Sequence, residues 1–160
     1  MEQKITPFLW FNDNAEEAMN YYVSIFKNSK ILSVNRYPEG APGPSGKVMT
    51  ATFELDGQQF TALNGGPEFG FTEAISFFVN CETQQEVDEL WDKLCAGGQP
   101  SMCGWLKDKY GLSWQIIPKA LGQLMGDKDP EKAGRVMQAM LQMQKIDVKK
   151  LEEAYAGATQ

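Results

Sequence analysis

Few residues of this 160-residue chain could do chemistry, and histidine is absent. Cys103 is a candidate nucleophile, but a cysteine nucleophile usually needs a neighbouring base or cation to form its thiolate. With no histidine available and Lys107 the nearest cation in sequence, the pattern favours a buried, inert thiol. Asp13 and Asp108 are candidate general bases, although each occupies a position where a turn or a helix cap favours aspartate. Structural roles are therefore favoured for all three side chains.

Composition narrows the class of protein further. A net charge of −6 argues against nucleic-acid binding, which normally needs a basic patch. The sequence shows neither a signal peptide nor an apolar run of about 18 residues, so we expect no membrane span. The three cysteines (Cys81, Cys95 and Cys103) are odd in number and lack Cys-x-x-Cys spacing, which indicates reduced thiols and a cytoplasmic location.

The elements that must position these residues form an internal repeat. Residues 5–66 and 74–118 each begin with an apolar strand, pass through a short polar turn and enter an amphipathic helix, at 15–26 and 84–96. Alternating patterns then predict strands at 30–37, 48–55, 59–64, 101–107 and 112–117. The plan is βαβββ twice, so we expect an α+β fold in a single domain covering 1–160.

Local signals place the ends of several elements. Asn14 is the expected N-cap of the first helix, and Asp56-Gly57 predicts a two-residue hairpin turn. Gly97-Gly98 is a typical end for the second helix.

A helical extension is expected over 119–156. Asp129-Pro130 begins one of its helices, and Asp147 can cap a last helix at 148–156. The first of these helices is rich in methionine, which favours packing in a core; a ligand lid or a partner surface is the alternative.

Three stretches carry a resemblance to a known family. They are 7–11 (PFLWF) with 15–18 (AEEA), 77–81 (FFVNC), and 103–118 (CGWLKDKYGLSWQIIP). The chain resembles the PhnB-like branch of the vicinal oxygen chelate superfamily, which includes glyoxalase I, bleomycin-resistance proteins and ring-cleaving dioxygenases. This branch is often labelled demethylubiquinone methyltransferase-like. The resemblance implies the glyoxalase/bleomycin-resistance fold, in which two curved sheets form a cleft, usually within a homodimer.

The resemblance also implies a divalent metal held by two histidines and one or two glutamates, yet the corresponding positions carry other residues. They are Thr6, Ala74 and Gln115, and the hairpin strand that would supply a glutamate has no carboxylate between 58 and 66. Amides and hydroxyls are poor ligands for transition metals, so we expect neither that metal nor a cofactor. A methyltransferase of the Rossmann type would need a glycine-rich turn opening a helix, and the pairs at 65–66 and 97–98 do not precede one.

Strand alternation and the family pattern together place a candidate ligand-binding cleft. We expect apolar walls with a few polar groups, as in most small-molecule sites. The residues are Phe8, Trp10, Ser76, Phe78, Ser113 and Gln115, with Thr6, Asn64, Cys103 and Trp105 as weaker candidates. A filled interior in which the aromatic rings simply pack is the alternative.

Three functions remain open at this point. The absence of histidine favours a metal-free, homodimeric protein that binds a small apolar or aromatic molecule. One alternative is an enzyme of undefined reaction, of methyltransferase or lyase/isomerase type, in which Gln115 orients the substrate. The other is a protein-interaction module that uses the C-terminal helices.

Overall fold

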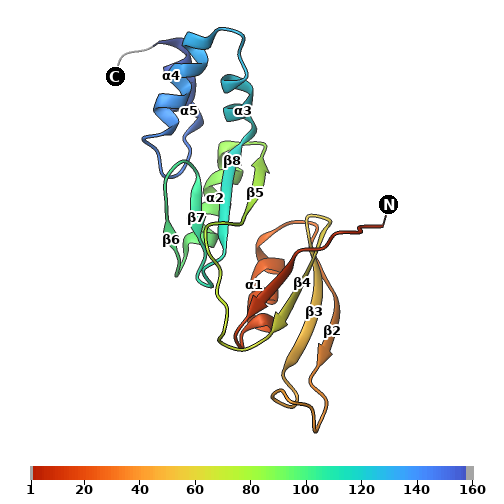
Figure 1. Ribbon diagram of the computed structural model, residues 1–160. Coiled ribbons are helices and arrows are strands. Elements are labelled where there is room, and N and C mark those ends of the chain that lie inside the picture. The colour runs from red at the N-terminus through yellow and green to blue at the C-terminus, as the bar shows by residue number, and fades with distance from the viewer. Residues whose placement is uncertain (1, 158–160) are drawn as a thin grey trace. The chain divides into compact units, whose positions relative to one another are not determined.

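The computed structural model describes residues 2–157, and the chain divides into two compact units, 1–71 and 72–160 (Figure 1). Each unit contains one βαβββ repeat, and the second unit carries three further helices at its C-terminal end. The α+β class and the repeated plan are therefore confirmed. Within the described residues, no helix combines the length and apolar character that crossing a membrane requires.

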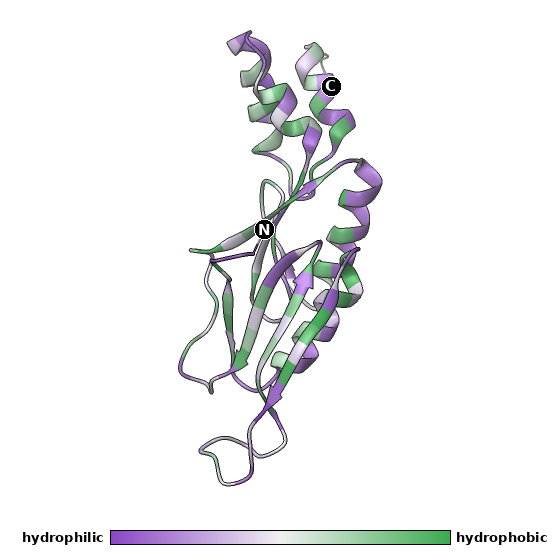
Figure 2. Cartoon of the chain, turned by 90° about the vertical axis from the view of Figure 1, so that its right-hand side faces the viewer, coloured by the Kyte–Doolittle hydropathy of each residue, from purple (hydrophilic) through white to green (hydrophobic). Residues whose placement is uncertain are grey.

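The first unit is a four-stranded sheet with one helix on one face. Its strands are β1 (Phe8–Phe11), β2 (Lys30–Arg36), β3 (Val48–Leu55) and β4 (Gln58–Asn64), in the order β1-β4-β3-β2. β1 and β4 are parallel and the other pairs are antiparallel. Buried and more exposed side chains alternate along β1, β4 and most of β3, so that one face is buried against the helix α1 (Ala15–Ile25). Figure 2 shows hydrophobic and hydrophilic residues interspersed along the strands. The core contains Leu9, Phe11, Ala18, Met19, Tyr22, Phe53, Phe60 and Ala62.

The start of α1 is held differently from the expectation. Asn14 occupies the N-cap position, but its side chain makes no capping hydrogen bond. Instead, the Asn64 side-chain oxygen accepts a hydrogen bond from the Ala15 amide at 2.9 Å, although Asn64 lies at the end of β4. A residue distant in sequence therefore pairs with a helix amide that has no partner within the helix, which local capping rules could not reveal.

The second unit repeats this arrangement. Its strands are β5 (Ser76–Cys81), β6 (Gln99–Pro100), β7 (Trp105–Lys107) and β8 (Ser113–Pro118), in the order β5-β8-β7-β6, with β5 and β8 parallel. The helix α2 (Gln84–Cys95) is capped by Thr83, whose side chain accepts a hydrogen bond from the Glu86 amide. The core between α2 and the sheet contains Val87, Leu90, Trp91, Leu94, Leu106, Trp114 and Ile116.

The single strand expected at 101–107 is wrong. Within this range only 105–107 form a strand, β7, which a turn joins to the short strand β6 at 99–100. Cys103 and Gly104 have φ angles of 60° and 84°, in the left-handed region that a strand cannot contain. Alternation alone did not reveal this turn, because a cysteine at a positive φ is uncommon.

Three helices follow β8: α3 (Lys119–Met125), α4 (Pro130–Met140) and α5 (Val148–Ala156). The caps expected at Asp129 and Asp147 are confirmed, since their side chains accept hydrogen bonds from the Glu131 and Lys150 amides. The sequence placed 119–125 within the helical extension but did not mark α3 as a separate helix. The helices pack around a shared cluster consisting of Ile117, Leu121, Val136, Ile146 and Leu151.

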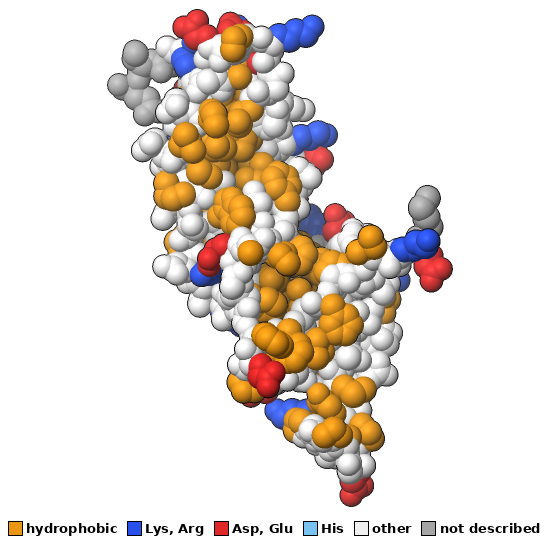
Figure 3. Space-filling model, viewed as in Figure 1, with side chains coloured by type: hydrophobic (Ala, Val, Ile, Leu, Met, Phe, Trp, Pro, Cys, Tyr) orange, Lys and Arg blue, Asp and Glu red, His pale blue; other side chains and the backbone are white. Residues whose placement is uncertain are grey.

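The methionine-rich helix α4 is only partly buried. Val136 is fully buried, and Met140 packs against the same cluster. Met137 and Leu141, however, are 44% and 41% exposed, and hydrophobic side chains are visible over these helices in Figure 3. The core role expected for the methionines therefore holds for one side of the helix.

The segment 143–148 ties the helical extension to the rest of the second unit. The Cys103 amide donates to the Met143 carbonyl at 2.7 Å, and the Gly104 amide donates to the Gln144 carbonyl at 2.8 Å. On α2, the Gln84 side chain donates to the Ile146 carbonyl at 2.9 Å and accepts from the Val148 amide at 2.8 Å. These bonds make the extension an integral layer of this unit.

Candidate functional site

Each sheet has one face turned away from the helix of its own repeat, and these faces carry the candidate residues. The Trp10 face of the first unit is formed by residues that share a side of β1, β4 and β3: Phe8, Trp10, Thr61, Leu63, Thr50 and Thr52. The Gln115 face of the second unit is formed in the same way from β5, β8 and β7: Ser76, Phe78, Ser113, Gln115, Trp105 and Lys107.

Trp10 is fixed in position by the segment that follows β4. Its indole N–H donates to the Gly66 carbonyl at 2.9 Å, and its ring meets Phe69 edge to face at 4.9 Å between centroids. A Cβ at Gly65 would lie 2.4 Å from the indole, so only glycine allows this close approach. Phe8, two residues earlier, is 59% exposed. The Trp10 face thus presents one anchored aromatic ring and one exposed ring.

Polar side chains cover the middle of the Trp10 face. The Thr52 and Thr61 hydroxyls lie 3.3 Å apart across β3 and β4, and the Asn35 amide donates to the Thr50 hydroxyl at 3.3 Å. The sequence analysis did not select these threonines, although the alternation along 48–55 places Thr50 and Thr52 on one side of the strand.

The Gln115 face brings together four of the expected residues. The Gln115 amide nitrogen donates to the Ser76 hydroxyl at 2.9 Å, which turns the side chain along the face. In the strand register Phe78 lies opposite Gln115, and Ser76 lies opposite Ser113. Phe78 is 53% exposed, so an apolar ring stands beside the paired amide and hydroxyl. This combination can hold a ligand that has both an aromatic body and a hydrogen-bonding group.

Ser113 has an unusual environment on this face. The residue is only 1% exposed, and within residues 2–157 its hydroxyl has no hydrogen-bond partner. Buried polar groups are nearly always paired, so an unpaired hydroxyl at this position requires an explanation.

The helical extension covers one end of the Gln115 face. Ile117 lies two residues beyond Gln115 on β8 and therefore on the same side of the strand. Its side chain is 7% exposed because it belongs to the cluster formed by the C-terminal helices. The free part of the face thus runs from Ser113 to Gln115.

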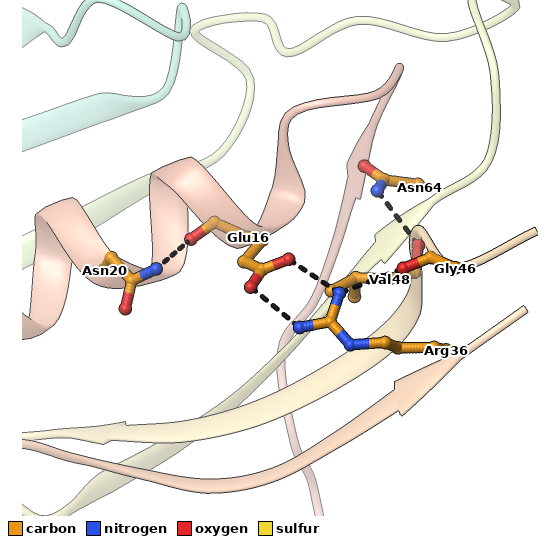
Figure 4. Close-up of polar contacts among 6 residues, drawn as sticks. All are labelled: Glu16, Asn20, Arg36, Gly46, Val48 and Asn64. Atoms are coloured by element: carbon orange, nitrogen blue, oxygen red, sulfur yellow. Dashed lines mark hydrogen bonds and ion pairs between the residues drawn. The ribbon is translucent and has the colours of Figure 1, made fainter. Parts of the chain in front are cut away.

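The weaker candidate Asn64 lies on the other side of its sheet. Its amide donates to the Val48 carbonyl at 2.9 Å (Figure 4). Its side-chain oxygen accepts from the Ala15 amide at the start of α1. Beside it, Arg36 of β2 binds Glu16 of α1 through two hydrogen bonds of 2.9 and 3.0 Å, which lower the pKa of the Glu16 carboxyl. These contacts hold the helix on the sheet, and Asn64 takes part in that framework.

The remaining weak candidates lie at the margins of the two faces. Thr6 precedes β1 and is half-buried, and Trp105 lies opposite Gln115 in the register of β7 and β8. Cys103 is half-buried in the turn before β7, with its backbone bonded to Met143. Trp105 is therefore the weak candidate that shares the Gln115 face.

The other potentially reactive groups, Cys81, Cys95 and Asp108, take part in the packing and hydrogen bonding of the fold. Burial raises the pKa of the Cys81 thiol to about 12 and that of the Cys95 thiol to about 11. Asp108 is 2% exposed, and its carboxylate accepts hydrogen bonds from the amides of Tyr110 and Leu112 and from the Trp114 indole. The aspartate shapes the turn between β7 and β8, as its sequence position suggested.

A metal of the glyoxalase type does not fit these residues. Within residues 2–157, no three histidine, cysteine, aspartate or glutamate side chains lie together as a bound metal would require. Gln115 is a neutral amide already bonded to Ser76, and β4 carries no carboxylate. No step of any reaction can therefore be assigned to a metal held in that way.

Comparisons with known proteins identify the family. The chain matches the family model described as 3-demethylubiquinone-9 3-methyltransferase over residues 3–117. The PhnB protein from Bacillus cereus is 45% identical, with a TM-score of 0.69 over 72% of this chain and 99% of that one. Protein PA1353 from Pseudomonas aeruginosa is 22% identical, with a TM-score of 0.61 over 73% of this chain and 98% of that one.

A more distant match is the glyoxylase/bleomycin resistance protein/dioxygenase domain from Frankia sp. EAN1pec, at 16% identity and a TM-score of 0.49, covering 74% of this chain and 92% of that one. The comparison with curated proteins gave no match. The match with the family model ends at Ile117, so the helices α3 to α5 lie outside the matched residues. The chain belongs to the PhnB-like 3-demethylubiquinone-9 3-methyltransferase family, as the stretches 7–11, 77–81 and 103–118 had indicated.

Proposed function

We propose that this protein is a metal-free, homodimeric, cytoplasmic protein that binds a small aromatic or apolar molecule on the Gln115 face, with the Trp10 face as a separate candidate surface. The observation that carries the proposal is the Gln115 face, where an exposed Phe78 ring stands beside the hydrogen-bonded Gln115 and Ser76. The Gln115 oxygen remains able to accept a hydrogen bond from a ligand. Small-molecule sites typically use a few polar groups to orient a ligand and apolar rings to bury it.

The Gln115→Leu variant tests the ligand site. Leucine keeps the volume of the side chain but removes both its donor and its acceptor, so a ligand group that pairs with the amide is left unpaired on binding. We expect the dissociation constant of the probe 2-naphthamide, measured by isothermal titration calorimetry, to rise by roughly 5- to 150-fold. Unfolding curves should show that the variant remains folded.

Gln123→Leu is the matched control, because Gln123 is exposed on α3. The control should bind 2-naphthamide as the native protein does. If the native protein binds no naphthyl compound, the ligand-binding proposal is wrong. Equal affinities in the Gln115 and Gln123 variants would remove the Gln115 face from the site and favour an interaction role for the C-terminal helices.

The homodimer is proposed from the open edge of the first sheet. All residues of β2 are exposed, including Ile31, Leu32 and Val34 at 42%, 41% and 38%. An exposed apolar edge strand can pair with a further strand unless it is covered. We expect light scattering at micromolar concentration to give twice the chain mass of 17.9 kDa, and Val34→Lys to shift the mass toward the monomer. A monomeric native protein would contradict the dimer.

A further inference from the structure

One cation lies on the Gln115 face, and a carboxylate of the same unit holds it. The Lys107 ammonium forms an ion pair with Glu73, which precedes β5. Both side chains are partly exposed, at 41% for Lys107 and 59% for Glu73. Ion pairs in such exposed positions are weak, so another anion can replace Glu73 at a small cost.

Lys107 and Ser113, whose hydroxyl is unpaired within the described residues, are neighbours across β7 and β8. In the strand register Lys107 lies opposite Ser113, and Ser113 lies opposite Ser76, so the three side chains form a row across β7, β8 and β5. The Ser113 hydroxyl is buried and has no hydrogen-bond partner within the described residues. Gln115 and Ser76, which are bonded to each other, complete the polar side of the row.

A lysine and a serine with an unpaired hydroxyl at neighbouring positions of the face favour an anionic oxygen, because hydrogen bonds to a charged acceptor are stronger than those to a neutral one. The neighbouring positions of the face carry the aromatic rings of Phe78 and Trp105, which lie on either side of Gln115 in the register. An anionic group at the row of Lys107 and Ser113 would thus leave the rest of its molecule against two rings. The chemistry of the face matches an aromatic carboxylate.

We propose that the Gln115 face binds an aromatic carboxylate. Its anionic group replaces Glu73 as the ion-pair partner of Lys107 and accepts a hydrogen bond from the Ser113 hydroxyl. This inference rests on the proposed ligand-binding function and specifies its ligand class. Glu73 acts as an internal competitor that occupies the ammonium when no ligand is bound. The ligand supplies the partner that the Ser113 hydroxyl lacks.

The test compares 2-naphthoate with its neutral counterpart 2-naphthamide, by isothermal titration calorimetry at pH 7. The native protein should bind the carboxylate at least about tenfold more tightly. Lys107→Met should abolish this preference. Ser113→Ala should raise the dissociation constant of 2-naphthoate by about tenfold. Glu73→Gln should bind naphthoate more tightly than the native protein does, with no change for naphthamide, because the competing carboxylate is gone.

Lys128→Met, at an exposed position between α3 and α4, is the control and should retain the native preference. Thermal unfolding of each variant verifies that it is folded. Equal affinities of the native protein for the two probes would overturn the carboxylate inference and leave the proposed function standing. A native protein that binds neither probe would overturn both. Weaker naphthoate binding by Glu73→Gln would show that Glu73 supports the ligand, contrary to the inference.

Discussion

Replacing Asp108 with alanine is expected to destabilise the second unit by about 3 kcal/mol or more. The buried carboxylate accepts hydrogen bonds of 2.8 and 3.1 Å from the Tyr110 and Leu112 amides and one of 2.9 Å from the Trp114 indole. Alanine removes this shared acceptor from donors packed in the turn between β7 and β8. Each loss carries a desolvation cost, because water cannot easily replace an acceptor in a buried site.

Denaturation in urea, followed by circular dichroism, measures this effect. The free energy of unfolding of Asp108→Asn should lie between those of Asp108→Ala and the native protein. A carboxamide oxygen can still accept hydrogen bonds from the turn amides but carries no charge. Asp13→Ala is the control, because Asp13 is exposed in the turn before α1, and its effect should stay within about 0.5 kcal/mol. A native-like stability for Asp108→Ala would contradict the structural role assigned to this carboxylate.

Gly98→Ala should have a comparable effect although it adds only one methyl group. A Cβ at Gly98 would lie 2.2 Å from the Lys107 carbonyl oxygen, and 2.8 and 2.9 Å from backbone carbons of Asp108. All three atoms belong to the backbone of β7, which pairs with β6, and of the turn that follows β7. The clash therefore cannot be relieved by the rotation of a side chain. Overpacking of this kind costs about 1–3 kcal/mol, and we expect the upper end of that range.

Gly122→Ala is the matched control for this substitution. Gly122 lies within α3, and a Cβ there would meet no atom within 4 Å. Alanine is a better helix former than glycine, so this variant should be more stable by about 0.5–1 kcal/mol. Opposite signs for the two glycines in the same thermal or urea unfolding assay are the expected result. A neutral Gly98→Ala would mean that the backbone of β7 can move to accommodate the methyl group.

The parts of the fold that depend on neighbours in the chain were predictable from the sequence. The last helix begins after Asp147 and spans Val148–Ala156, as its cap and spacing indicated. The hairpin at Asp56-Gly57 has φ angles of 49° and 80°, which is the conformation that this pair favours. Alternation also placed Ser113 and Gln115 on one side of β8, and the register agrees. These signals are local because caps, turns and strand periodicity involve residues a few positions apart.

The parts that depend on distant contacts were not predictable. The helix α3 carries no strong cap, and it is buried through Leu121 in a cluster with Val136, Ile146 and Leu151. The break between β6 and β7 is stabilised where the Cys103 and Gly104 amides bond to the carbonyls of 143–144, about forty residues later. Rules based on neighbouring residues cannot identify hydrogen-bond acceptors so far along the chain.

In the candidate site too, the residues were predictable from the sequence, whereas their contacts were not. Strand alternation and the family resemblance together indicated Gln115, Ser76 and Ser113 as site residues. Neither could indicate that Glu73 holds Lys107, or that the Ser113 hydroxyl is buried without a partner in the described chain. The sequence by itself determined which side chains share a face, since that follows from the backbone period of two. Only the tertiary structure decided which of them are already paired, because pairing depends on the strand register and on segments that meet from far apart in the chain.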